Sequence, residues 1–257
     1  MTWSIVARDP STGAFGVAVA TRFFAVGALC PFADGGIGAG ATQALMNPLY
    51  AIDALRLLRE GIEAEAIVQR LTAADAGRAA RQLHVQDAAG RIAAHTGSDC
   101  VPWCGHLATG GFSVAGNMLT GPEVIAETAR AYEAGASLPF AQRLIVALMA
   151  GEAAGGDKRG KQSAALRIHT SEPYPALDLR VDDHAEPLAE LARLEAVSRE
   201  RFVHFAGYLP TRAVPAGVFD RAVIEAGIAS REAEHAAGRT AEHAAEHAAE
   251  RNAAASR

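Results

Sequence analysis

The chain has 257 residues, half of them hydrophobic, and its 24 Lys and Arg against 29 Asp and Glu give a formal net charge of −5. This content is ample for a buried core, and the lack of a basic excess argues against nucleic acid or an anionic membrane as a partner. Because no run of about 18 apolar residues and no N-terminal export signal is present, we expect a cytoplasmic protein that binds a small molecule.

The first half of the chain reads mainly as strands. Residues 2–9 and 15–20 form a predicted hairpin around an Asp-Pro-Ser-Thr-Gly turn. Asn47 and Pro48 predict the start of a helix that continues to about Arg59, and a second helix is expected over residues 63–71. The remaining predicted strands of this half cover residues 35–43, 82–86, 91–94 and 112–116.

The second half begins with two predicted half-buried helices and then returns to strands. The helices open near residues 121–122 and 137–139, and the strands cover residues 163–169 and 177–181. A helical pattern follows over residues 187–206, and the end of the chain is rich in Ala, Glu and His. We therefore predict a folded domain over residues 1–206 and a helical C-terminal tail over residues 207–257.

Thr2 follows the initiator methionine and opens an apolar strand. Loss of Met1 would give this residue a free α-amine, with a pKa of about 7.7–8.0, beside its own hydroxyl. Such a threonine carries a nucleophile and a base on one residue, as in hydrolases with an N-terminal nucleophile. The structural alternative is that a small residue simply follows Met1.

Two thiols and two imidazoles occur close together at His95, Cys100, Cys104 and His106. Their spacing would suit a structural zinc ion if the loop folded back on itself. We favour buried cysteines and loop histidines, because both histidines flank the cysteine pair closely instead of coming from a separate element. A Cys–His nucleophile is the third interpretation of these residues. No metal and no other cofactor is therefore expected.

The sequence His243-Ala244-Ala245-Glu246-His247 matches the pattern of inverted zinc peptidases. It lies in a segment where Ala, Glu and His recur through compositional bias. We interpret it as a solvated helix surface and not as a metal site.

A charged loop between glycines contains Asp157, Arg159, Lys161 and Gln162. It could bind a carboxylate, because arginine offers a planar fork of donors and lysine a compact charge, or it could be an exposed turn. Asn117 could aim an amide donor at a developing oxyanion, or it could be an ordinary turn residue.

Several blocks together resemble DUF1028, a bacterial family of unknown function, over residues 1 to about 195. The blocks begin at Thr2-Trp3-Ser4-Ile5 and include Ala41-Thr42-Gln43, His95-Thr96-Gly97, Gly116-Asn117-Met118-Leu119, Gly155-Gly156-Asp157, Gln162-Ser163-Ala164-Ala165 and Leu179-Arg180-Val181-Asp182-Asp183-His184. The resemblance implies an α+β fold of the N-terminal-nucleophile (Ntn) hydrolase type, a four-layer αββα sandwich with a C-terminal helical extension.

The resemblance also implies an activity and a site. Similar enzymes cleave amide-type C–N bonds through an acyl-enzyme, and Thr2 matches the nucleophile, with Ser4 as the fallback. We expect Asn117 to stabilise the oxyanion and Asp157 to assist in orienting the amine. Thr42 and Gln43 would line the pocket, while Arg159, Lys161 and Gln162 would contact an anionic substrate.

Three hypotheses remain open at the level of the sequence. The first is an Ntn-type amidohydrolase for a small anionic amide. The second is a non-catalytic ligand-binding protein of the same fold that keeps Met1, and the third is a zinc-stabilised interaction module. A homo-oligomer is compatible with each of them.

Overall fold

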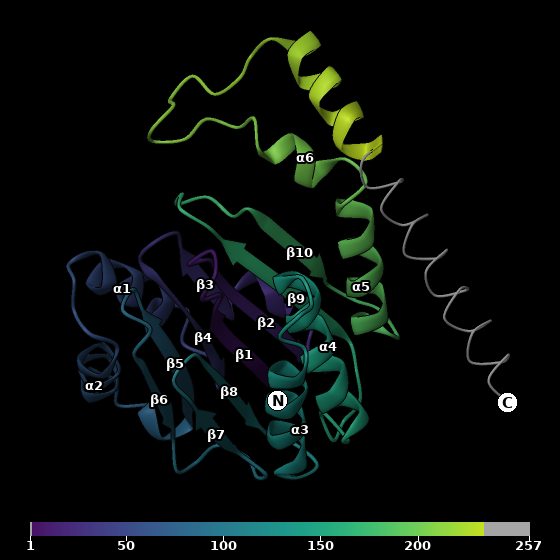
Figure 1. Ribbon diagram of the computed structural model, residues 1–257. Coiled ribbons are helices and arrows are strands. Elements are labelled where there is room, and N and C mark those ends of the chain that lie inside the picture. Colours follow the sequence, from purple (N-terminus) through teal and green to yellow (C-terminus); the bar gives the residue numbers. More distant parts are fainter. Residues whose placement is uncertain (1, 234–257) are drawn as a thin grey trace, which may run out of the picture. The chain divides into compact units, whose positions relative to one another are not determined.

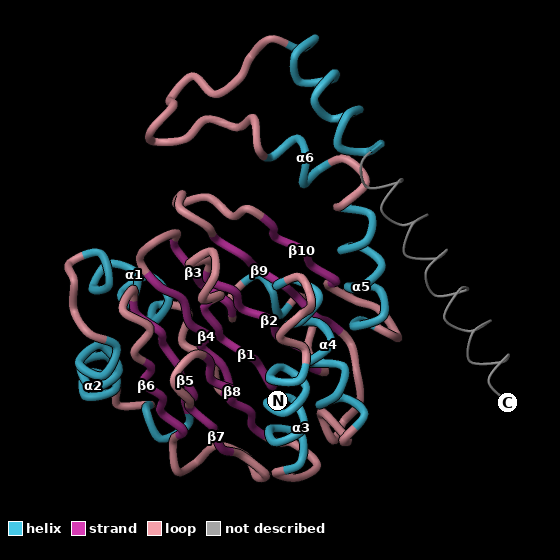
Figure 2. The backbone as a smooth tube through the Cα atoms, in the orientation of Figure 1, coloured by secondary structure: helices cyan, strands magenta, loops and turns pink. Residues whose placement is uncertain are grey.

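The computed structural model describes residues 2–233. They divide into two compact units between residues 195 and 196, within one helix. The first unit contains both β-sheets (Figures 1 and 2). No helix among the described residues combines the length and apolar character needed to cross a membrane.

The larger sheet has six antiparallel strands in the order β10-β9-β2-β1-β8-β7. Its strands are β1 (Thr2–Arg8), β2 (Phe15–Thr21), β7 (Gly105–Ala108), β8 (Phe112–Asn117), β9 (Ser163–His169) and β10 (Leu177–Val181). Because β1 lies in the middle, the strand that begins at Thr2 is paired with β2 on one side and with β8 on the other.

The smaller sheet has four antiparallel strands in the order β3-β4-β5-β6. They are β3 (Pro31–Asp34), β4 (Gly38–Ala44), β5 (Arg81–Asp87) and β6 (Ile92–Thr96). A short 3₁₀ turn, η1 (Val26–Ala28), links the two sheets, and η2 (Arg78–Ala80) precedes β5.

Helices follow the sheets in pairs: α1 (Leu49–Arg59) with α2 (Ala64–Ala74), and α3 (Glu123–Ala134) with α4 (Phe140–Ala153). The start of α1 is held as its sequence predicts, because the backbone N–H of Leu49 donates to Oδ1 of Asn47 at 3.1 Å. Helix α5 (Pro187–Ser198) follows β10, and α6 (Phe202–Ala206) belongs to the second unit.

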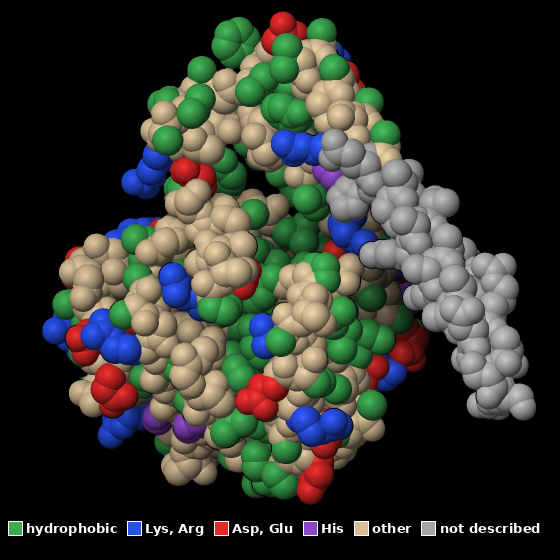
Figure 3. All heavy atoms as spheres, viewed as in Figure 1, with side chains coloured by type: hydrophobic (Ala, Val, Ile, Leu, Met, Phe, Trp, Pro, Cys, Tyr) green, Lys and Arg blue, Asp and Glu red, His purple; other side chains and the backbone are tan. Residues whose placement is uncertain are grey.

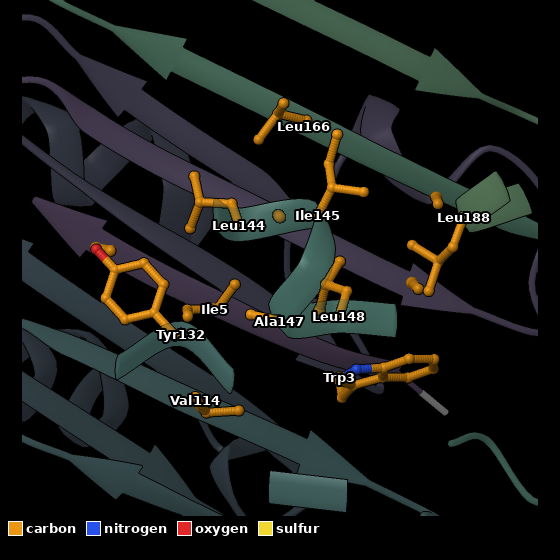
Figure 4. Close-up of a cluster of buried hydrophobic side chains, with 14 of the residues drawn as sticks. Trp3, Ile5, Val114, Tyr132, Leu144, Ile145, Ala147, Leu148, Leu166 and Leu188 are labelled. Carbon is orange, nitrogen blue, oxygen red and sulfur yellow. The ribbon is translucent and has the colours of Figure 1, made fainter. Parts of the chain in front are cut away.

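Three apolar clusters show which surfaces face one another. One joins α1 and α2 to the four-stranded sheet, and a second fills the space between the sheets. The third joins α3, α4 and α5 to the other face of the six-stranded sheet, and Figure 4 shows Trp3 and Ile5 of β1 among its members, near Leu148 of α4. An α+β fold with antiparallel sheets is therefore confirmed.

Most predicted elements are present, and β9 and β10 have the predicted bounds. The sequence pattern did not predict β3 and β7, which are only four residues long. The continuous helix predicted over residues 187–206 is wrong: it stops at Ser198, and Arg201 leaves helical geometry at φ −142° and ψ −45°. There Arg201 pairs with Glu225, 2.7 Å away, on a helix that starts at residue 221.

Candidate functional site

Alternation along β1 decides which side chains can take part in a site between the sheets. Trp3, Ile5 and Ala7 join the cluster beneath α3 and α4, whereas Val6 joins the cluster between the sheets. Since neighbouring strand residues point to opposite faces, Thr2 and Ser4 also face the second sheet. Both are buried, with 7% and 0% of their surface exposed.

Thr2 lies where the central strands of the six-stranded sheet begin or end, and we call this end of the strands the sheet edge. It pairs with Asn117, the last residue of β8, and its Oγ1 donates to Oγ1 of Thr21, the last residue of β2, at 3.2 Å. The antiparallel register therefore brings together three polar side chains that are distant in sequence.

Asp157 lies at the same edge, because Leu119 just after β8 forms an isolated bridge with it. Its carboxylate accepts the backbone N–H of Arg22 at 2.7 Å and that of Arg159 at 2.8 Å. Arg22 directly follows Thr21, so Asp157 fixes the chain beside the hydroxyl that contacts Thr2. The structure thus gathers Thr2, Asn117 and Asp157 in one region, with Asp157 bound to the surrounding backbone.

A buried polar network continues inward from Asn117, and most of its members were missed in the sequence. Gln82, His84 and Gln86 alternate along β5 and are all 0% exposed. The available signal was three polar side chains at every second position of a predicted strand, which indicates one polar face. Gln82 contacts Asn117 of the opposite sheet, and His84 contacts Ser4 and Ser113. Nε2 of Gln86 donates to the carbonyl of Gly111.

Backbone carbonyls fix the direction of the hydrogen bonds in this network. Nε2 of Gln82 lies 3.0 Å from the carbonyl of Gly105 and 2.9 Å from that of Gly116, and a carbonyl can only accept. Oε1 of Gln82 must therefore accept, and it receives Nε2 of Gln43 at 2.8 Å and Nδ2 of Asn117 at 3.0 Å. The carbonyl of Ala115, 3.1 Å from Nε2 of Gln43, requires the same orientation of Gln43.

The same reasoning assigns donor and acceptor roles to Ser4 and His84. Oε1 of Gln43 can only accept, so the hydroxyl of Ser4 donates to it across 2.7 Å. Ser4 Oγ consequently accepts the N–H of His84 Nε2 at 2.9 Å, so this nitrogen holds a proton. Nδ1 of His84 lies 2.8 Å from the hydroxyl of Ser113, which donates to it when the ring is the neutral Nε2–H tautomer.

The electrostatic environment agrees with a neutral imidazole. Burial, with a smaller contribution from the charge of His106, lowers the pKa of His84 to about 3. A ring that already holds a proton on Nε2 is unable to take the proton of Ser4. The contact between Ser4 and His84 is therefore a structural hydrogen bond and does not activate Ser4.

Asn117 has both amide N–H groups directed at protein acceptors. One reaches Oε1 of Gln82 and the other reaches the carbonyl of Thr2 at 3.4 Å. The second bond is long for an N–H···O contact and is correspondingly the weaker one. It is the donor that an oxyanion beside Thr2 could take over.

The two residues predicted to line a pocket from β4 face opposite ways. Gln43 belongs to the network between the sheets, whereas Oγ1 of Thr42 donates to the carbonyl of Asn47 at 3.1 Å. Thr42 thus holds the turn before α1, and its side chain lies on the face of the sheet opposite to that of Gln43.

Arg159 and Lys161, the two loop cations predicted to contact the substrate, are paired with carboxylates. Arg159 pairs with Asp157 at 3.3 Å, and Nζ of Lys161 lies 3.0 Å from Glu152 and 2.6 Å from Glu186. Hydrogen bonds to Glu186 and Glu152 raise the pKa of Lys161.

Gln162 and Arg22 lie in the same region as these cations. Nε2 of Gln162 donates to Asp183 at 3.1 Å. A hollow of about 520 Å³ next to the loop is lined by Arg22, Lys161, Gln162, Asp183, His184, Ala185 and Glu186. Arg22 is the guanidinium in this hollow without an acidic partner among the described residues; it donates to the carbonyl of Arg159 at 3.3 Å.

The cysteine and histidine side chains of residues 95–106 bond to separate groups. His95 contacts the carbonyl of Arg78, and His106 contacts Oγ1 of Thr96. The Cys100 thiol donates to the carbonyl of Arg81, and the Cys104 thiol to the carbonyl of Cys100. Within residues 2–233 no group of three or more His, Cys, Asp or Glu is placed to hold a metal ion. The pattern at His243 and His247 lies outside the described residues.

A cavity of about 310 Å³ adjoins Asn117. Its lining consists of Ala44, Leu45, Ala80, Asp99, Cys100, Val101, Asn117 and Met118. Ala44 and Met118 have left-handed backbones, with φ of 68° and 58°. Such conformations are uncommon for residues other than glycine and concentrate at functional sites, which favours this edge of the sheets as the site.

The face drawn in Figure 3 shows how charged side chains are distributed on one side of the protein. In the view of Figure 3, Lys and Arg are interspersed with Asp and Glu on the surface of the first unit. The surface in this view therefore offers no extended basic or acidic platform for a macromolecule.

Fold and site together define an α+β protein with two facing antiparallel sheets and a polar site at one sheet edge. Residues 2–191 match the family described as "Family of unknown function (DUF1028)", and the chain belongs to that family. Its structure is similar to the crystal structure of protein SPO2555 from Silicibacter pomeroyi, which is described as a member of the same family. The two are 33% identical, with a TM-score of 0.79, and the match covers 86% of this chain and 96% of the other. No curated protein matches the chain.

Proposed function

We propose that this protein is an Ntn-type amidohydrolase that cleaves the C–N bond of a small amide bearing an anionic group. The proposal includes the finer fold assignment, a four-layer αββα sandwich. It is supported by the three apolar clusters, which alternate with the two sheets. The observation that carries the activity is the position of Thr2: the first strand residue, with its hydroxyl between the sheets, paired with Asn117 at the edge of a cavity.

The reaction would start when removal of Met1 exposes the α-amine of Thr2. The amine takes the proton as Oγ1 attacks the amide carbon, and the carbonyl oxygen becomes an oxyanion. Asn117 exchanges its 3.4 Å bond to the Thr2 carbonyl for a bond to this oxyanion. The C–N bond then breaks, the protonated α-amine supplies the proton to the leaving amine, and water hydrolyses the acyl ester on Thr2.

The surrounding residues would hold this geometry. Gln82 orients the Asn117 amide, and Asp157 fixes the backbone that carries Thr21. Arg22 is available for an anionic group of the substrate, because Arg159 and Lys161 are already paired with carboxylates. This differs from the sequence-based expectation in which Arg159 and Lys161 bind the substrate directly.

A non-catalytic binding protein of the same fold is the second candidate. It is favoured by one observation: both N–H groups of Asn117 already have acceptors, so the oxyanion site has to be opened. A chain that keeps Met1 would have no free amine on Thr2 and would fit this second function.

The test combines the mass of the intact protein with acyl trapping. We expect the purified protein to begin at Thr2 and to form a hydroxylamine-labile acetyl ester on the Thr2 hydroxyl after incubation with p-nitrophenyl acetate. Thr2→Ala should lose this ester, and Ser4→Ala should keep it. A retained Met1 in protein that still forms the ester, or an ester on Ser4, would refute the Thr2 mechanism, and a retained Met1 with no ester would favour the binding protein.

A further inference from the structure

The cavity beside Asn117 also indicates what kind of group the protein binds there. Its size limits the ligand: at about 30 Å³ per water, 310 Å³ corresponds to about ten water-sized volumes. A group of up to about ten non-hydrogen atoms would therefore fill it. This is at the small end of ligand pockets.

The wall is largely apolar and is held by backbone contacts. Met118 N donates to the carbonyl of Val101 at 2.7 Å, and Leu45 N donates to that of Ala80 at 3.1 Å. These bonds hold the residues on either side of the cavity and accompany the left-handed backbones of Ala44 and Met118. The cavity is thus built by four chain segments that approach one another.

Only one ionised group lines the cavity. Asp99 is exposed and accepts the hydroxyl of Ser98 at 3.0 Å, with no ion pair to any described residue. The Cys100 thiol is neutral at neutral pH, because burial raises its pKa.

Three cations near the cavity-lining residues have protein partners. One of them, Arg81, reaches the cavity wall, where its Nη1 donates to the carbonyl of Leu45. Arg81 pairs with Asp75 at 3.0 Å, and the guanidinium of Arg78 donates to the carbonyl of Asp75. Lys158 donates to the carbonyl of Pro102 at 2.9 Å. The charge of Arg81 is balanced by Asp75, and none of the three side chains lines the cavity. The charge within the lining is therefore that of the Asp99 carboxylate, which repels an anion.

We infer that this cavity binds a compact apolar group that ends in an ammonium, and that it excludes carboxylates. The next step rests on the proposed function. If the protein cleaves an amide at Thr2, the bound group is the acyl half of the substrate, and the scissile carbonyl lies beside Asn117 and Thr2. An anionic group of the same substrate belongs on the leaving-amine side, near Arg22. The substrate class is then an amide whose acyl chain carries an amino group at its far end.

Binding is measured without catalysis, in the full chain carrying Thr2→Ala. The chain has four methionines, Met1, Met46, Met118 and Met149, so the ¹³C-methyl spectrum is simple and Met118 reports on the cavity. Met149 on α4 is the internal control. The probes are n-butylammonium, butyramide and butyrate.

We expect n-butylammonium to shift the Met118 methyl signal and to leave the Met149 signal unchanged. Butyramide should bind more weakly than n-butylammonium, and butyrate should bind most weakly. Because the Asp99 carboxylate is exposed, its attraction for an ammonium is small. Asp99→Asn should raise the Kd of n-butylammonium by about two- to fivefold and leave the Kd of butyramide unchanged. Asp53→Asn, on the exposed face of α1, is the matched control and should change neither.

Three results would overturn the inference: no shift of Met118 with any probe, butyrate binding as tightly as n-butylammonium, or an Asp99→Asn variant that keeps full preference for the ammonium. Each of them is independent of the acetyl-trapping test. A trapped acetyl ester on Thr2 with an unresponsive Met118 would retain the proposed hydrolase and reject this subsite.

Discussion

Thr2 and Ser4 lie two residues apart on the same face of β1, and the difference between their surroundings is instructive. Ser4 has an imidazole nitrogen at 2.9 Å, the arrangement expected of an activated nucleophile. Thr2 instead contacts the hydroxyl of Thr21 at 3.2 Å, and it lies at the sheet edge beside Asn117, which borders a cavity.

The comparison shows that proximity of a hydroxyl and a histidine does not make a catalytic pair. Around Ser4, every donor and acceptor is assigned by the carbonyls of Gly105, Gly116 and Ala115, and the ring stays neutral. Around Thr2, the weak 3.4 Å bond of Asn117 leaves one donor that can be displaced. A reactive hydroxyl needs a cavity that admits the substrate and a hydrogen-bond donor that can turn to the oxyanion. Of the two positions, Thr2 has both beside it.

The largest expected effect separates the two hydroxyls by activity. Thr2→Ala should reduce turnover of any amide substrate by at least about a thousandfold, because it deletes the attacking oxygen, and Thr2→Ser should retain part of it. Ser4→Ala should retain most of the turnover and instead lower the free energy of unfolding. Steady-state kinetics of all three variants with one substrate give the comparison, and an inactive Ser4→Ala beside an active Thr2→Ala would reverse our assignment.

The next effect concerns the amide that orients Asn117. Gln82→Leu should reduce the free energy of unfolding by about 3–5 kcal/mol, because it leaves buried carbonyls and amide donors without partners. Gln86→Leu on the same strand is the matched control and should cost only about 1 kcal/mol, since Gln86 Oε1 has no partner and its Nε2 makes one bond of 3.1 Å and one of 3.5 Å. Urea unfolding measures both; equal losses would show that the two glutamines act only as packing.

A smaller effect arises from the neutral His84. Its pKa in the folded protein, about 3, is lower than the unfolded value of about 6.5, so the unfolded chain binds the extra proton between these values. Stability should therefore be complete above pH 6.5 and fall as the pH is lowered toward 3, with a contribution of at most about 1.4 kcal/mol per pH unit.

His84→Gln removes this titration and should flatten the dependence of unfolding free energy on pH. His184→Gln, in the exposed loop before α5, is the control and should leave the slope of the parent protein. An unchanged slope in His84→Gln would mean that His84 is charged in the fold, against the neutral Nε2–H tautomer.

The smallest effect is expected from the second unit. Removing all residues after Gly217 should leave the melting temperature of the first unit unchanged, because its clusters between sheets and helices are formed before residue 196. The residues from 201 to 217 would lose the partner that Glu225 gives to Arg201. Calorimetry measures the melting temperature of the first unit. A large drop in this temperature would show that the removed residues stabilise the first unit.

Local pattern was sufficient for most strands and helices. Alternating apolar residues with turn residues at their ends gave β1, β2, β9 and β10, and Asn47 gave the start of α1. Four-residue strands such as β7 carry too little periodicity to be read, since their pairing is set by the long neighbour β8. Just after the break at Ser198, Arg201 contacts Glu225, a residue 24 positions further along the chain, and local pattern does not predict such a contact.

By itself the sequence determined Thr2 as the first residue of a buried strand, the family, and a set of polar candidates at Asn117 and Asp157. Which of them meet was decided only by the tertiary structure. Strand register placed Asn117 opposite Thr2, side-chain parity turned Gln43 inward and Thr42 outward, and contacts across the two sheets made His84 a neutral structural residue. Local propensity contains no information on these long-range contacts of Asn117, because they join residues 35 to 115 positions apart.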